Sequence, residues 1–142
     1  MDISFKKDRT ISDSERKRID KAWKVFDKNL YGQDYVSLGT FYFKAYDNNQ
    51  LIGLITADIE GGVVVIDEFI VLEKYRGQGV GVMLINNLIK FAKRKKCRKI
   101  TLETDPRIRT ASFYKKIGFI QEAKVPNNFA KNDSVILSMY LK

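Results

Sequence analysis

The chain has 142 residues, 44% of them hydrophobic, and a formal net charge of +9 at pH 7. This length and composition suit one domain with a single hydrophobic core, and the positive charge will attract anionic partners. Because the sequence holds no histidine and only one cysteine, an internal disulfide, histidine-containing zinc sites and Ser-His-Asp or Cys-His catalysis are all excluded.

The first residues, MDISFKK, lack the apolar run of a signal peptide, and no later stretch approaches the roughly 20 apolar residues that cross a bilayer. We therefore expect a cytoplasmic protein without membrane contact. A short opening strand is predicted at residues 3–6. Ser12 then stands three residues before Glu15, which is a capping-box spacing. The apolar residues that follow at helical intervals predict an amphipathic helix with Ile19, Ala22, Trp23 and Phe26 on one face.

Three strands are predicted in the next part of the chain, at residues 40–46, 51–59 and 63–71. Aromatic residues mark the first strand, and the turn-forming sequences DNNQ and EGG separate the three. The third strand is apolar on both faces except for the adjacent Asp67 and Glu68, as expected for a central strand covered by helices. Asp67 and Glu68 are therefore the unusual residues of the predicted core, because they are charged in an otherwise apolar strand.

After a loop at residues 72–79, apolar spacing predicts a helix that runs to about residue 96. Its end carries the basic run KFAKRKKCRK at residues 90–99. Such a run could bind nucleic acid, but it is more often the solvated face and last turn of a helix. A strand, a short helix and two closing strands are predicted at residues 100–104, 110–116, 119–123 and 134–141. This order implies an α/β fold with a mixed sheet and helices on its faces.

The sequence VLEKYRGQGVG, at residues 71–81, joins the central strand to the following helix. Glycines at alternate positions let the backbone turn tightly, and the N–H groups at the helix start point at a ligand together with the positive end of the helix dipole. Such a corner binds phosphate or pyrophosphate, although it could also serve only the packing of strand against helix. It fits neither the G-x-G-x-x-G nor the P-loop pattern. Dinucleotides and nucleoside triphosphates are therefore not favoured.

Two motifs at the expected separation resemble those of the GNAT superfamily of N-acetyltransferases. Arg76-Gly77-Gln78-Gly79-Val80-Gly81 matches the R/Q-x-x-G-x-G/A acetyl-CoA signature, although Glu73 replaces a common proline in the approach to it. Phe113-Tyr114, followed by Gly118-Phe119, is similar to the second signature. The resemblance implies one GNAT domain over residues 1–142, with a mostly antiparallel mixed sheet of six to seven strands, splayed at the fourth strand, and about three to four helices.

The same resemblance implies an activity and a set of binding residues. The enzyme would pass the acetyl group of acetyl-CoA directly to a primary amine, without a metal. Backbone amides at the splayed strand end would pair with pantetheine, and the loop would hold the pyrophosphate. These cofactor-binding residues are Phe69, Ile70, Val71, Arg76, Gly77, Gln78, Gly79, Val80 and Gly81. Arg107 stands where an asparagine is common, and it could reach a cofactor phosphate.

The resemblance also gives a catalytic role to Tyr114, which matches the family tyrosine that can protonate the departing thiolate. Its other interpretation is a core aromatic residue on a short helix. An amine attacks a thioester only when unprotonated, so the site also needs a proton acceptor, and Asp67 and Glu68 are the candidates. Adjacent strand residues face opposite sides, so only one of the two can face the substrate unless a bulge intervenes. The sequence leaves open which of them acts, or whether they pair with lysines instead.

The acyl acceptor is the least defined partner. Residues 66–71 followed by Tyr75-Arg76-Gly77 are similar to polyamine and streptothricin acetyltransferases, which points to a small cationic amine. Acetylation of a protein lysine or N-terminus is the alternative, and a basic nucleic-acid-binding domain is the alternative outside enzymes. Specificity is expected from residues 19–37 and 125–133. Aromatic and acidic candidates in or near these regions are Trp23, Tyr31, Tyr35, Asp34, Glu122 and Asp133. A homodimer is compatible with the family.

Overall fold

The structure is a computed structural model, and it describes residues 1–32 and 37–142. The chain divides into two compact units, Met1–Tyr35 and Val36–Lys142, and each is described by itself. That the whole chain forms one domain remains a prediction. No helix among the described residues is long and apolar enough to cross a membrane.

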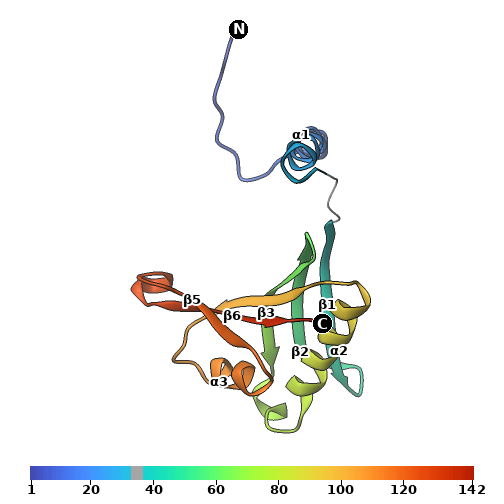
Figure 1. The fold of residues 1–142 in the computed structure, drawn as a ribbon, viewed down its shortest axis with the longest axis vertical. Coiled ribbons are helices and arrows are strands. Elements are labelled where there is room, and N and C mark those ends of the chain that lie inside the picture. Colours follow the sequence, from blue (N-terminus) through green and yellow to red (C-terminus); the bar gives the residue numbers. More distant parts are fainter. Residues whose placement is uncertain (33–36) are drawn as a thin grey trace. The chain divides into compact units, whose positions relative to one another are not determined.

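The first unit contains helix α1, Asp13–Tyr31, as predicted (Figure 1). The capping box forms: the Glu15 backbone N–H donates to Ser12 Oγ at 3.2 Å, and the Ser12 N–H donates to Glu15 Oε2 at 2.8 Å. These hydrogen bonds hold the pKa of Glu15 below its ordinary value. The helix ends at Gly32, whose φ of 75° is left-handed. Local sequence alone therefore determines both ends of α1.

The opening strand predicted at residues 3–6 is wrong. These residues have no regular structure, and the side chains of Ile3 and Phe5 are 78% and 93% exposed. Two apolar side chains followed by Lys6 and Lys7 offer little surface with which to hold an edge strand. The strand that was expected to be the fourth is therefore the third one observed.

The second unit contains a six-stranded sheet in the order β1-β2-β3-β4-β6-β5. The strands are β1 Ser37–Asp47, β2 Gln50–Glu60, β3 Val63–Val71, β4 Lys99–Thr104, β5 Ile120–Val125 and β6 Ser134–Tyr140. Two helices, α2 Val80–Arg94 and α3 Arg109–Lys116, complete the unit with the short 3-10 turns η1 Glu73–Tyr75 and η2 Phe129–Lys131. Only the β3–β4 pair is parallel among the described strands. The predicted mixed, mostly antiparallel sheet is confirmed.

Helices α2 and α3 pack against one face of the sheet, which we call the helix-covered face, and the hydrophobic core lies between them and the sheet. Helix α2 buries Leu84, Ile85, Leu88 and Ala92, which recur at helical spacing. They pack over β2, where a Cβ added at Gly53 would lie only 3.0 Å from Leu84 Cδ1. Glycine at position 53 therefore lets α2 approach the sheet closely.

The sheet is splayed between β3 and β4, as predicted. Their pairing in the described structure joins Val63–Val65 to Lys99–Thr101 and goes no further. Figure 1 shows the antiparallel strands β1, β2 and β3 roughly aligned along one axis, while β5 and β6 cross that axis. The second half of β3 therefore keeps β2 on one side and has no strand paired on the other.

Candidate functional site

The loop between β3 and α2 turns on two glycines with left-handed backbone. Gly77 has φ 72° and Gly79 has φ 85°. A Cβ added at either residue would meet no atom within 4 Å, so backbone conformation and not crowding selects glycine there. The loop thus leaves open space beside its backbone, which a ligand can approach closely.

The start of α2 presents backbone N–H groups to that space. Gly79 is the N-cap, and the first bond of the helix runs from the Met83 N–H to the Gly79 carbonyl at 3.0 Å. The amides of Val80, Gly81 and Val82 precede that bond and have no carbonyl one turn earlier to donate to. The first turn contains no acidic residue. The positive end of the dipole is therefore available to an anion such as a phosphate.

The third glycine of the loop serves packing. A Cβ added at Gly81 would lie 3.3 Å from Phe69 Cζ and 3.6 Å from Phe113 Cζ. The rings of Phe69 and Phe113 lie 5.5 Å apart, with Tyr114 at 5.8 Å from Phe69. Gly81 therefore lets the start of α2 meet β3 and α3 at one aromatic cluster.

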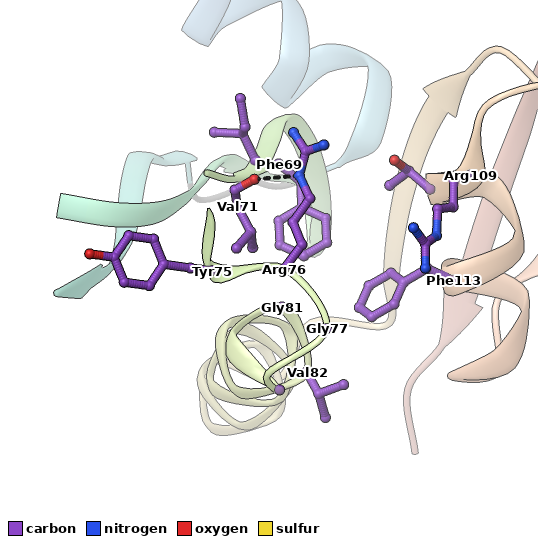
Figure 2. Close-up of a pocket in the computed structure, with 12 residues that line it drawn as sticks. Phe69, Val71, Tyr75, Arg76, Gly77, Gly81, Val82, Arg109 and Phe113 are labelled. Atoms are coloured by element: carbon purple, nitrogen blue, oxygen red, sulfur yellow. Dashed lines mark hydrogen bonds between the residues drawn. The ribbon is translucent and has the colours of Figure 1, made fainter. Parts of the chain in front are cut away.

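Arg76 ties the loop to the end of β3. Its Nε donates to the Val71 carbonyl at 2.9 Å, as Figure 2 shows. Gln78 Nε2 donates to the Lys74 carbonyl at 3.0 Å, so this side chain closes the turn upon itself. These two hydrogen bonds hold the loop backbone in place on either side of Gly77.

A pocket of about 540 Å³ lies between this loop, the end of β3 and α3. Seven predicted cofactor-binding residues line it: Phe69, Ile70, Val71, Arg76, Gly77, Gly79 and Gly81. Gln78 and Val80 are not among its lining residues, and the Val80 side chain instead packs against the core. The structure therefore brings most of the two predicted cofactor segments together around one pocket.

Other residues of the pocket were missed by the sequence analysis. Arg109 and Phe113 of α3 face the loop across the pocket (Figure 2), and Thr110 and Val82 also line it. Arg109 and Phe113 are spaced i and i+4, so they share a helix face. That spacing was the one available signal that both would point the same way.

Arg107 lies outside this lining. Its guanidinium pairs with Asp105, where Nε donates to Oδ1 at 2.9 Å, and these contacts lower the pKa of Asp105 to about 2. The pair is local, only two residues apart, and it belongs to the loop that leads into α3. The positive charge that the structure places in the pocket from this side is Arg109.

Asp67 and Glu68 lie at a β-bulge. Thr56 of β2 is opposite Glu68 and Ala57 is opposite Ile66, so Asp67 is an extra residue in β3. Both carboxylates are exposed, whereas Ile66 before them is buried. In a regular strand, adjacent side chains point to opposite faces. The bulge allows both carboxylates to project from the same face of β3. Within the unit Val36–Lys142, the side chains of Val65 and Ile70 are 40% and 50% exposed, and the covering of β3 by helices on both faces stays a prediction.

The environment of Asp67 raises its pKa to about 6. The largest cause is a hydrogen bond with the Asp58 carboxyl, followed by burial and by the negative charges of Asp58 and Glu68. Burial contributes less because Asp67 is exposed at the bulge, and Asp58 had not been identified as its neighbour.

Tyr114 is 2% exposed and lies among Phe69, Phe113 and Phe119. Burial raises the pKa of its phenol well above the ordinary value, so the hydroxyl keeps its proton across the physiological range. The ring therefore contributes to the core, and it also contacts Phe69, which lines the pocket.

The remaining candidates have local partners or lie elsewhere. Trp23 and Tyr31 are exposed on α1, and Tyr35 and Asp34 fall outside the described residues. Glu122 accepts from Lys99 Nζ at 2.6 Å, and Asp133 pairs with Lys124 at 3.1 Å. In the parts of the chain that the structure describes, no three His, Cys, Asp or Glu side chains gather as a metal site.

Residues 7–119 match the sequence model of the Acetyltransferase (GNAT) family, which covers both the glycine loop and α3. The chain belongs to the GNAT family. It is therefore an acyltransferase that uses acetyl-CoA. The open, left-handed backbone of the glycine loop and the start of α2 have the chemistry that suits phosphate groups.

Three known proteins are similar to this GNAT enzyme in sequence or in fold. The chain is 28% identical over 120 residues to the [ribosomal protein bS18]-alanine N-acetyltransferase of Haemophilus influenzae, covering 80% of this chain and 78% of the relative. A candidate streptothricin acetyltransferase from Bacillus anthracis, solved in complex with acetyl coenzyme A, is 25% identical with a TM-score of 0.66. That match covers 72% of this chain and 63% of the other. A candidate acetyltransferase from Agrobacterium tumefaciens, 16% identical, superposes over 98% and 100% of the two chains with a TM-score of 0.75.

Replacing Gly77 or Gly79 by alanine is expected to weaken acetyl-CoA binding. An L-residue in left-handed backbone costs about 1–2 kcal/mol, and the free loop can relax away from that conformation while the bound loop cannot. If the loop bears the whole cost, the Kd for acetyl-CoA in calorimetry rises about 5- to 30-fold. Gly39→Ala in β1 is the matched control, because its φ is 79° and its added Cβ also meets nothing. Equal affinity in the loop variants and the control would contradict this role of the loop.

Proposed function

We propose that this GNAT enzyme acetylates the primary amine of a small cationic molecule. The observation that carries the proposal is the bulge in β3, which exposes two adjacent carboxylates directly before Phe69 and Ile70 of the pocket. In a chain of net charge +9, carboxylates placed there favour an acceptor that is itself a cation. The likeness to the candidate streptothricin acetyltransferase supports the same class of acceptor.

Two parts of the chain would hold acetyl-CoA. Beyond Val65, the edge of β3 that faces β4 is not paired with it. The main chain of Phe69, Ile70 and Val71 would hydrogen-bond there with the amide-containing pantetheine arm of acetyl-CoA. The loop from Arg76 to Gly81 and the start of α2 would hold the diphosphate. When bound, acetyl-CoA supplies a thioester whose carbonyl carbon an amine nitrogen can attack.

The chain's own side chains would manage the protons. A carboxylate of the bulge, Asp67 or Glu68, takes a proton from the substrate ammonium and leaves the nitrogen lone pair free to attack. The new N–C bond would form as the C–S bond breaks, and Tyr114 would give its phenolic proton to the departing sulfur. The second proton lost by the nitrogen would restore the phenol. Overall, one ammonium and one thioester give one amide, one thiol and one proton, which passes to solvent.

A second candidate function is acetylation of a protein N-terminus. The curated relative from Haemophilus influenzae acts on an alanine of ribosomal protein bS18, and its match covers 80% of this chain. The same loop, pocket and carboxylates would serve that reaction, because only the acceptor changes. The two functions are therefore separated by the substrate and not by the cofactor site.

The test has two stages on the purified full-length chain. Calorimetry with acetyl-CoA and with CoA comes first, and the absence of saturable heat with both would contradict both functions. A thiol-release assay then compares spermidine, streptothricin, an aminoglycoside, a peptide that begins with alanine and an N-terminally blocked peptide with an internal lysine. Turnover of a small amine with silent peptides supports the proposal. Turnover of the alanine peptide alone would replace it with the second function.

A further inference from the structure

Three neighbouring strands place a row of polar side chains on the face of the sheet opposite the helix-covered face. Thr40 of β1 is opposite Asp58 of β2, and Asp58 is opposite Val65 of β3. Asp67 follows Val65 by two residues on the same strand, so its side chain is the diagonal neighbour of Asp58. The Asp58 and Asp67 carboxyls form a hydrogen bond, and the Thr40 hydroxyl donates to Asp58.

We propose that Asp58 is a positioning residue for Asp67: the neighbouring carboxylate makes Asp67, not Glu68, the group that takes the proton from the acceptor amine, and the two carboxyls then share that proton. This inference rests on the proposed acetyl transfer and names its base. It adds Asp58 and Thr40 to the residues on which that reaction depends.

The hydrogen bonds decide where the shared proton resides. Two carboxyls in contact do not both ionise at the pH at which an isolated carboxyl does, so one of them keeps its proton to a higher pH. The Thr40 hydroxyl donates to Asp58 and stabilises its ionised form, and the pKa of Asp58 is lowered accordingly. Asp67 is left as the proton holder, with its pKa raised to about 6.

Glu68 is held differently. The hydroxyl of Thr56, which is 7% exposed, donates to Glu68 Oε2 at 2.7 Å and fixes this carboxylate against β2. The charged groups that act on Asp67 are therefore Asp58 from β2 and Glu68 from β3 itself, and β1 contributes the neutral hydroxyl of Thr40. Glu68 serves as a fixed negative charge beside the base.

A base with this proton affinity suits the reaction. Above about pH 6 Asp67 is ionised and can accept a proton, and it accepts one more readily than an ordinary aspartate with a pKa near 3.9. As the pH falls through 6, Asp67 becomes protonated and the base is lost. The acidic limb of the activity profile should therefore lie near pH 6.

Carboxyl-carbon NMR of the full-length chain, titrated from pH 3 to 9, tests the pair without any substrate. Asp67 is expected to titrate near pH 6 in the wild type, and its midpoint should fall toward about 4 in Asp58→Asn. Glu68→Gln is the matched control, because it removes the weakest of the four causes and should move the midpoint much less. A wild-type midpoint near 4, or one unchanged in Asp58→Asn, would overturn the proposal even if acetyl-CoA binds.

The catalytic part has its own readout, with acetyl-CoA and spermidine as probes. The acidic limb of kcat/KM should move to lower pH in Asp58→Asn by the amount that NMR gives for Asp67, and kcat at pH 7.5 should fall about tenfold with an unchanged KM for acetyl-CoA. A merely structural Asp58 would lower activity without moving that limb. If no acceptor is turned over, the proposed function fails while the titration still decides whether the pair exists.

Discussion

Asp67→Asn is expected to lower turnover by about 10²-fold or more, the usual scale of acid-base catalysis. Asparagine has nearly the same shape and can keep a hydrogen bond with Asp58, but it cannot accept a proton from an ammonium group. The bulge that exposes residue 67 and the pocket beside it would remain. The loss should therefore appear in kcat, measured by thiol release at saturating acetyl-CoA, and the affinity for acetyl-CoA should hardly change.

Two further variants make this result interpretable. Asp8→Asn removes one negative charge from the N-terminal segment outside the sheet and should keep full activity. Glu68→Gln should lose less than Asp67→Asn, because Glu68 acts through its charge. Full activity in both Asp67→Asn and Glu68→Gln would exclude a carboxylate base at the bulge, and a large loss in Glu68→Gln alone would transfer the role to Glu68.

Tyr114→Phe is expected to lower kcat by about 10²-fold while leaving the fold intact. The ring packs among Phe69, Phe113 and Phe119, and phenylalanine preserves those contacts. What the variant removes is a hydroxyl that burial keeps protonated, and with it the proton for the departing sulfur. Thermal unfolding and acetyl-CoA affinity should match the wild type.

Tyr46→Phe provides the comparison for Tyr114, since it makes the same change at an exposed tyrosine of β1. It should leave kcat unchanged. If Tyr114→Phe were also fully active while Tyr114→Ala unfolded, Tyr114 would be a core aromatic residue and another group would protonate the sulfur. The two outcomes separate the two interpretations that the sequence left open.

Local signals were sufficient for most of the fold. The capping box at Ser12 and Glu15 determined where α1 begins, and the strand-loop-helix pattern around Gly77 and Gly79 located the pocket. Each of these features depends on residues within a few positions of one another. The opening strand failed because alternation at only Ile3 and Phe5 is too short a pattern to specify a strand, and residues 3–6 have no regular structure.

The pairing of distant residues could not be predicted in this way. Asp58 meets Asp67 only because the β2–β3 register places it opposite Val65, and a shift of one residue would turn its side chain to the other face. The bulge at Asp67 is likewise set by pairing with β2 and not by its own sequence. The cause of the raised pKa was therefore invisible until the strands were paired.

The separation of β3 from β4 also affects how the protein behaves in solution. From Ile66 to Val71 the strand has a hydrogen-bonding edge inside the sheet, which β4 does not satisfy. A sheet edge accepts an extended backbone of suitable length, so the gap that we propose for the pantetheine arm can also receive a stray peptide or a strand of another molecule. Acetyl-CoA bound in this gap is then expected to compete with self-association. Concentrated protein kept with CoA should remain dispersed where the bare protein aggregates.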